Sequence, residues 1–404
     1  MKQYNKYITF FGLYIAQAIP MSFFTTVVPV IMRQENYSLE SIGLLQLVKL
    51  PWILKFLWAP LVDKKANTLS QYKKWIITSE VFYALIILSI GAFSLQANFN
   101  LIVVLIVIAV IASATQDIAT DALAILSLKK DQHSMGNAVQ SAGGFIGALI
   151  GSGLLLLIYH TFGWFMLLVG LSCFVLLAVI PLLFFRYPLR PKPMGINISG
   201  KDIVRFFTQK GIFKYVVFLL LSYSGLSGML AMLKPYMFDN KYDLEQIGFI
   251  SGILGTSMAA LFAFVAGLLI KKVGLRKMLQ VIPCLGIFVG VYFYVMNNSA
   301  FSDIQLIIGV CALWATYGMM NVAIFVMAMN KSRLGLEGTD FTLQIVVTQF
   351  GSLLIAGLSG FVSQRFTYQG LFIMEIVLSL ITILYVYLLY RNKKIDALSE
   401  KTNT

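Results

Sequence analysis

Apolar runs recur along the whole chain and are separated by short polar segments. Each run is long enough to cross a lipid bilayer as an α-helix, which needs about 20 residues. The stretch 8–32 is too long for the core of a signal peptide and lacks a small-residue cleavage site, so we expect it to be retained as the first span. The pattern predicts twelve membrane-spanning helices, at residues 8–32, 40–62, 75–95, 99–126, 136–159, 163–185, 211–235, 245–270, 277–297, 303–329, 339–363 and 368–390.

The composition supports an integral membrane protein. Of the 404 residues, 59% are hydrophobic and 12% are charged, whereas a soluble domain has about 25% charged residues. Cys173, Cys284 and Cys311 all lie within apolar runs, so we expect neither disulfides nor a metal cluster. The predicted fold class is an all-α membrane protein.

Basic residues indicate which side of the membrane each loop faces. With twelve spans, most of the 31 lysines and arginines lie in loops on the side of the two termini. On the opposite side lie only Arg33, Lys234, Lys241 and Arg365. Since cytoplasmic loops are enriched in lysine and arginine, we expect both termini in the cytoplasm. The basic residues are scattered over short loops, which argues against a nucleic-acid partner.

A Pro-rich, basic loop at 186–211 divides the chain into two halves of six predicted spans. We expect an N-terminal six-helix bundle at 1–185, a cytoplasmic linker at 186–210, a C-terminal six-helix bundle at 211–391 and a cytoplasmic tail at 392–404. The halves repeat, because "YSLESIGLLQL" at 37 matches "YDLEQIGFISG" at 242, each at the start of the second helix of its half. Parallel repeats of this kind are typical of transporters that rock around a central site.

Several short motifs resemble those of known transporters. The segment "GLLIKKVGLRK" resembles the major facilitator loop signature G-x-L-x-D-x-x-G-x-R, with lysine at the acidic position, and "WAPLVDKK" is a less complete copy. The segments "LKFLWAPLVD", "QDIATDA" and "NKS" resemble the AmpG-type muropeptide permeases and the related acetyl-CoA transporters. The segment "GTDFTLQ" and the block at 23–63 look closer still to the RhtX/FptX-type siderophore importers.

The resemblance implies two six-helix bundles in the inner membrane of a bacterium, with helices 1, 4, 7 and 10 around a central cavity. Polar and aromatic residues on these helices are candidates to line it, although such groups more often bond to neighbouring helices. The candidates are Tyr14, Gln17, Gln116, Tyr223, Ser227, Trp314, Tyr317 and Asn321.

Four charged residues lie inside predicted spans: Lys49 and Lys55 on helix 2, and Asp117 and Asp121 on one face of helix 4. Counting from the loop ends at 1.5 Å per residue places Lys55 and Asp121 at about 12 Å, with Lys49 and Asp117 deeper. We therefore expect the pairs Lys49–Asp117 and Lys55–Asp121. One interpretation is a structural lock between the two helices. The other is that Asp117 exchanges a proton while Lys49 contacts an anionic solute.

Other features remain open between packing and function. Gly143, Gly147 and Gly151 form a small-residue stripe on helix 5 that permits close helix contact or marks where the halves slide. Glu375, early in helix 12, is expected either to reach outward or to cap a neighbouring helix.

Three residues near loop ends are candidates for gating. In the family that the chain resembles, the position of Asp63 helps to close the cytoplasmic side by holding the two halves together. Asp340 lies at the start of helix 11, where an acid interacts favourably with the helix dipole, and could belong to the same closure. Arg276 is the last residue of the loop signature after helix 8.

These features favour a proton-driven secondary transporter that imports a small polar or anionic solute, such as a siderophore, by alternating access. The alternatives are an AmpG-like permease for muropeptides and a non-transporting sensor with a transporter fold. An enzyme is not expected, because the sequence shows no clustered catalytic set, and no nucleotide-binding loop is present. We expect no cofactor apart from protons as the coupling ion, a small-molecule solute and the lipid bilayer as partners, and a monomer.

Overall fold

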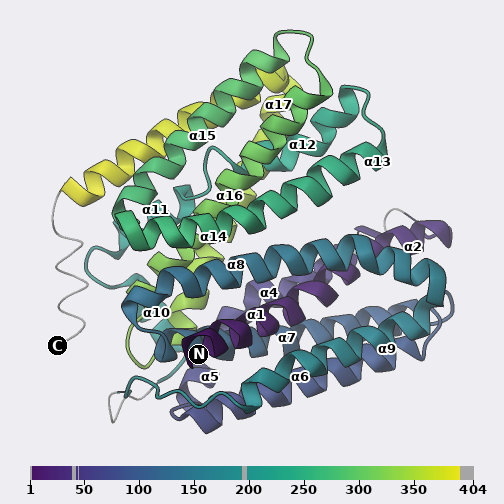
Figure 1. Ribbon diagram of the computed structural model, residues 1–404, viewed down its shortest axis with the longest axis vertical. Helices are drawn as coiled ribbons and strands as arrows, with labels where there is room; N and C mark the ends of the chain where they lie inside the picture. Colours follow the sequence, from purple (N-terminus) through teal and green to yellow (C-terminus); the bar gives the residue numbers. More distant parts are fainter. Residues whose placement is uncertain (1, 39–41, 44, 193–197, 392–404) are drawn as a thin grey trace. The chain divides into compact units, whose positions relative to one another are not determined.

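The computed structural model describes residues 2–38, 42–43, 45–192 and 198–391, and all regular structure in these ranges is helical (Figure 1). Short π-helical or 3₁₀ segments connect several of the α-helices. The α-helices are α1 Lys2–Ser22, α2 Val28–Gln34, α4 Leu50–Leu54, α5 Ala59–Lys65, α6 Leu69–Gly91, α7 Phe99–Ser127, α8 His133–Leu149, α9 Leu155–Leu183, α10 Lys201–Phe207, α11 Ile212–Leu221, α12 Ser227–Asp239, α13 Leu244–Ile247, α14 Thr256–Val273, α15 Leu275–Asn297, α16 Asp303–Lys331 and α17 Glu337–Arg391.

Within the described ranges, eight helical stretches are long and apolar enough to cross a membrane. The predicted spans 40–62, 136–159 and 211–235 are not among them as single α-helices, because each is interrupted or continues into a neighbour. The last two predicted spans share α17, which bends at Phe366 and Thr367 between them. The fold is all-helical and membrane-spanning, and the count of twelve remains a prediction.

Proline and glycine explain where these helices break. From residue 46 onward, predicted span 40–62 is a 3₁₀ segment, α4, a second 3₁₀ segment and the start of α5, and a proline stands in the first turn of each α-helix. Proline fits the first turn of a helix but cannot continue the hydrogen bonding of a preceding one. Between α11 and α12, Gly225 has a φ of 87°, which a residue with a side chain rarely adopts.

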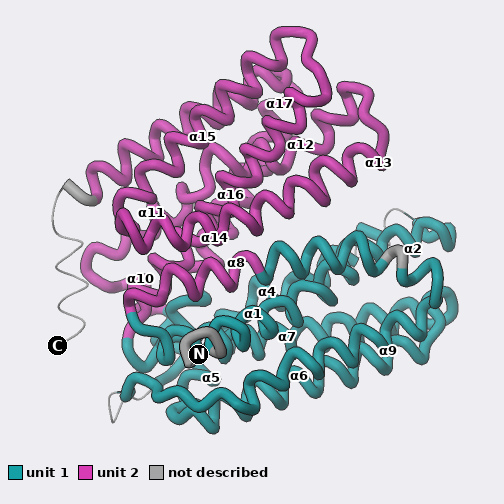
Figure 2. The backbone as a smooth tube through the Cα atoms, viewed as in Figure 1, with its two compact units in different colours: residues 1–129, 143–203, 334–342 teal, residues 130–142, 204–333, 343–404 magenta. Residues whose placement is uncertain are grey.

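Contacts group the chain into two compact units (Figure 2). Unit 1 comprises residues 1–129, 143–203 and 334–342, and unit 2 comprises residues 130–142, 204–333 and 343–404. Each unit thus includes a short segment from the other half of the sequence: α8 begins in unit 2, and α17 begins in unit 1. The bundle and linker boundaries expected from the sequence remain predictions.

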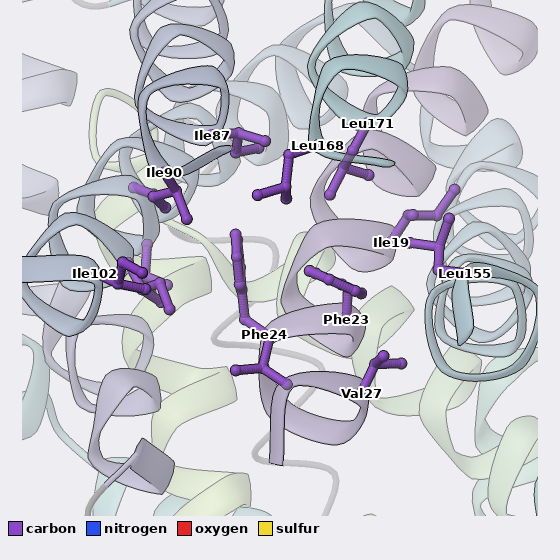
Figure 3. Close-up of a cluster of buried hydrophobic side chains, with 14 of the residues drawn as sticks. Ile19, Phe23, Phe24, Val27, Ile87, Ile90, Ile102, Leu155, Leu168 and Leu171 are labelled. Atoms are coloured by element: carbon purple, nitrogen blue, oxygen red, sulfur yellow. The ribbon is translucent and has the colours of Figure 1, made fainter. Parts of the chain in front are cut away.

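An apolar core joins α1, α6, α7 and α9 within unit 1 (Figure 3). Phe23 and Phe24 are fully buried at its centre, with ring centroids 5.5 Å apart. Ile87 from α6 and Leu168 from α9 are also fully buried in this cluster. The core therefore holds α7, the helix that carries Asp117 and Asp121.

The internal repeat predicted from the sequence has a structural counterpart. The Tyr37 hydroxyl donates to the Leu95 carbonyl at 2.7 Å, just before α7. The Tyr242 hydroxyl donates to Asp303 Oδ1 at 2.6 Å, at the first residue of α16. Each tyrosine therefore ties the start of the second predicted span of its half to the region where the third predicted span ends and the fourth begins. Residues 39–41 and 44 of the first copy lie outside the described ranges.

The glycine stripe of predicted helix 5 packs against α1 inside unit 1. A Cβ atom on Gly147 would lie 2.5 Å from Ala18 Cβ, and one on Gly151 would overlap the Ile19 carbonyl. Gly143 approaches Tyr14 in the same way. Close packing of α1 therefore accounts for the stripe.

We predict that Gly151→Ala destabilises the protein by about 1–3 kcal/mol, because the added methyl group must displace the backbone of α1. Gly144→Ala is the matched control, since nothing lies within 4 Å of a Cβ there. Thermal unfolding in detergent should give a lower Tm for Gly151→Ala only. Equal Tm values for the two variants would contradict the close packing.

Candidate functional site

Buried polar side chains from α1 and α7 meet inside unit 1. The Tyr14 hydroxyl donates to Asp121 Oδ1 at 2.7 Å, and the Gln17 amide donates to Gln116 Oε1. Asp117 and Asp121 lie on one face of α7, four residues apart, as the helical period requires. The structure thus brings the N-terminal candidates together into one polar cluster within an apolar bundle.

Lys55 forms an ion pair with Asp117 in this cluster. The side chain of Lys55 is 5% exposed and that of Asp117 is 7% exposed, so both charges are withdrawn from solvent. The Lys55 ammonium also lies 4.7 Å from the centroid of the Trp52 ring, a favourable cation–π contact. We call Tyr14, Gln17, Lys55, Gln116, Asp117 and Asp121 the charged cluster.

The predicted pairs Lys49–Asp117 and Lys55–Asp121 are wrong. Lys49 is exposed, and its ammonium donates to Gln46 Oε1 at 2.9 Å. The depth estimate assumed an α-helix throughout, but residues Lys55–Leu57 and Gln46–Lys49 form 3₁₀ turns. A 3₁₀ helix has 3.0 residues per turn rather than 3.6, so the side chains of Lys49 and Lys55 do not point where a continuous α-helix would place them.

The C-terminal candidates form an uncharged cluster in unit 2. The Tyr223 hydroxyl donates to Asn321 Oδ1 at 3.3 Å, and the rings of Tyr223 and Tyr317 have centroids 5.2 Å apart. Trp314 packs edge-on against Tyr317 at 6.0 Å. The Ser227 hydroxyl contacts the hydroxyl of Ser352 at 2.6 Å. These residues offer hydrogen bonds and aromatic faces, whereas the buried ion pair belongs to unit 1.

Glu375 lies against the break between α11 and α12. The structure therefore supports the expectation that it caps a neighbouring helix. Its carboxylate is fully buried and accepts a hydrogen bond from the Ser359 hydroxyl at 3.2 Å. Backbone N–H groups of Gly225 and Gly228, at the start of α12, also bond to it. The first turn of a helix has free N–H groups, and a carboxylate is the preferred partner for them.

Asp63 binds the start of α17 through three hydrogen bonds. Asp63 Oδ1 accepts the Gly338 N–H at 3.1 Å, and Oδ2 accepts the Thr339 N–H and hydroxyl, each at 2.7 Å. A side chain on Gly338 would collide with Ile118, so glycine permits this close approach. We call Asp63, Gly338 and Thr339 the latch. It lies entirely within unit 1, although its two sides come from opposite halves of the sequence.

The two other gating candidates differ in their surroundings. Asp340 is fully buried in the first turn of α17, where its N–H donates to the Leu336 carbonyl at 2.8 Å. Arg276 is exposed near the start of α15, in unit 2. Their roles in gating remain predictions.

Sequence reasoning missed two charged residues beside the latch, Lys192 and Glu337. Their charged groups are 3.6 Å apart, and both side chains are buried. Lys192 looked like one more basic residue of a Pro-rich loop, and Glu337 like an ordinary loop acid. Burial raises the pKa of the Asp63 carboxyl to about 7, while the nearby Lys192 ammonium and the Thr339 hydroxyl oppose that rise.

Comparison with known proteins identifies the family. The model of the Major Facilitator Superfamily matches residues 10–354. The chain belongs to the major facilitator superfamily. It is therefore a membrane transporter rather than an enzyme, and its charged and uncharged clusters lie in a transporter fold.

Curated relatives of this superfamily member carry AmpG-type names. It is 21% identical over 404 residues to putative transporter AmpG 3 of Rickettsia prowazekii, with 96% of each chain covered. It is also 21% identical over 272 residues to the anhydromuropeptide permease of Escherichia coli K12, covering 66% of this chain and 55% of the permease. Among solved structures, the transporter FucP in the outward conformation has the same fold, with a TM-score of 0.72 at 14% identity over 95% of this chain and 98% of FucP.

We predict that Lys55 and Asp117 are energetically coupled. Lys55→Met or Asp117→Asn alone leaves a buried charge without its partner, which costs about 3–5 kcal/mol. The double variant should be markedly more stable than the sum of the two losses implies. The free energy of unfolding in detergent measures this coupling, and exposed Lys49→Met is the control. Strictly additive losses would rule out the pair.

We also predict a pH dependence of stability from Asp63. Its folded pKa of about 7 lies above its ordinary value of 3.8, so the folded protein binds the proton more tightly. This tighter binding of the proton stabilises the folded state at low pH, and the stabilisation is lost as pH rises through about 7. The Tm of the wild type minus that of Asp63→Asn should therefore fall between pH 5 and pH 8. A difference that stays constant or rises with pH would contradict this assignment.

Proposed function

We propose that this transporter imports a small polar or anionic solute into the cytoplasm, driven by protons, through alternating access. The buried Lys55–Asp117 ion pair is the observation that supports this most directly. Charges inside a membrane bundle are costly, and those that occur commonly serve ion or proton pathways. The termini are taken to be cytoplasmic on the distribution of basic residues in the loops.

The ion pair suggests how a proton and an anionic solute are exchanged for one another. While Asp117 is ionised, it neutralises Lys55. A proton on Asp117 removes that neutralising charge, and Lys55 then becomes available to a carboxylate or phosphate of the solute. Tyr14, which bonds to Asp121, and the Gln17–Gln116 pair supply neighbouring polar groups. Lys55 takes the role expected for Lys49, because Lys49 is exposed.

The names of the curated relatives suggest a class of solute. Their AmpG-type names favour a cell-wall muropeptide, which carries both sugar hydroxyl groups and carboxylates. The resemblance of "GTDFTLQ" and of the 23–63 block to siderophore importers supports the second candidate. Both classes present anionic groups to a lysine, so transport of the two must be compared directly.

We predict that Asp117→Asn abolishes proton-driven accumulation while the protein still inserts into the membrane. The assay is uptake of labelled anhydromuropeptide, and separately of a labelled ferric siderophore, into proteoliposomes with an imposed pH gradient. Asp131→Asn makes the same acid-to-amide change at an exposed position and should leave uptake unchanged.

The outcomes separate the hypotheses. If Asp117→Asn accumulates the solute as the wild type does, Asp117 is not the coupling acid. If the wild type binds a probe but accumulates neither probe under any gradient, the sensor alternative gains support. If the rate of uptake does not depend on the pH gradient, proton coupling is excluded.

A further inference from the structure

The loop that joins the two halves of the sequence is tied to unit 1 before it reaches residue 193. The Arg190 N–H donates to the Leu126 carbonyl at 3.0 Å, and its guanidinium donates to the Leu128 carbonyl at 2.9 Å. The Lys6 ammonium lies 4.5 Å from the centroid of the Tyr187 ring. These contacts fix the linker beside the end of α7, so Lys192, two residues after Arg190, has a defined position.

Lys192 extends from this linker to both sides of the latch. Its ammonium donates to the Ala66 carbonyl at 2.9 Å and to the Asp63 carbonyl at 3.3 Å, at the end of α5. It also lies 3.6 Å from Glu337 Oε2, at the start of α17, and 5.3 Å from the centroid of the Tyr72 ring. A cation at the end of one helix and an acid at the start of another are both favoured by the helix dipoles.

The charges around Lys192 require a cation. The carboxylates of Asp63 and Glu337 are both almost completely buried, and they lie close enough to repel each other. Glu337 Oε1 accepts the Gly335 N–H at 2.9 Å, but neutral backbone donors do not fully offset a buried negative charge. The Lys192 ammonium attracts both carboxylates and opposes the rise that burial gives their pKa values, so withdrawing it would favour uptake of a proton by one of them.

We propose that Lys192 is a gating residue, and that the linker closes the cytoplasmic gate by placing this ammonium between α5 and α17. The proposal rests on the transport cycle proposed above. If the linker moves away from the latch, segment 334–342 loses its contact with Lys192. This segment leads directly into the part of α17 that belongs to unit 2.

A cysteine placed under the latch can report whether the gate is open. Thr342 is fully buried in the segment 334–342, so Thr342→Cys reacts with an impermeant maleimide only when this segment lifts. The reporter is introduced after Cys173, Cys284 and Cys311 have been replaced by serine, and labelling is followed from the cytoplasmic side in inside-out vesicles. The full-length protein is used, and no solute is needed.

Lys192→Gln should label roughly tenfold faster than the parent, since loss of one charge-assisted hydrogen bond shifts an equilibrium by about this factor. Lys192→Arg retains the charge and should restore slow labelling. Lys201→Gln is the matched control, an exposed lysine of the same linker, and should label like the parent. Glu337→Gln removes the partner from the other side and should also speed labelling, which keeps the test available if Lys192→Gln does not fold.

A further variant separates the role of the latch in closing the gate from the role of Lys192. Asp63→Ala removes every acceptor for Gly338 and Thr339 and should speed labelling if the latch closes the gate. If Asp63→Ala speeds labelling but Lys192→Gln and Glu337→Gln do not, the role of Lys192 is refuted while the gate stands. If none of the three has an effect, both are refuted. A lack of solute uptake in the wild type would count against the proposed transport function without altering this labelling result.

Discussion

The cost of placing a charge among apolar helices governs the arrangement of this protein. A buried ion is tolerated when another charge or several hydrogen-bond donors compensate for the lost water. Lys55 and Asp117 satisfy this condition by pairing with each other, and Asp63 satisfies it through donors at the start of α17. In each case the compensating groups come from a different helix, so the requirement to partner a charge also determines which helices meet.

The sequence predicted the class of fold because hydrophobicity, loop charge and repetition depend on long segments. It also identified the residues of the charged cluster, since a charge within an apolar run is conspicuous. It paired them wrongly because helix 2 is not a continuous α-helix, and the 3₁₀ turns at Gln46–Lys49 and Lys55–Leu57 change the direction in which each lysine side chain points.

The residues missed by sequence reasoning have a different physical origin. Lys192 belongs to a Pro-rich basic loop, and nothing in such a loop distinguishes a lysine that contacts lipid headgroups or water from one that is buried against two carboxylates. Its role depends on contacts between segments far apart in the chain. The two loop signatures also differ, with Asp63 in the first half and Lys271 at the corresponding position of the second. The two copies of the repeat therefore carry opposite charges at this position.

The division of α17 between the units has a consequence for biogenesis. Unit 1 includes residues 334–342, so the first half of the chain leaves the ribosome well before the N–H groups that bind Asp63 have been made. During that interval the carboxylate must stay in contact with water at the membrane surface. Completion of unit 1 then waits for most of unit 2 to be synthesised, which makes assembly of this protein a late event rather than two independent folding steps.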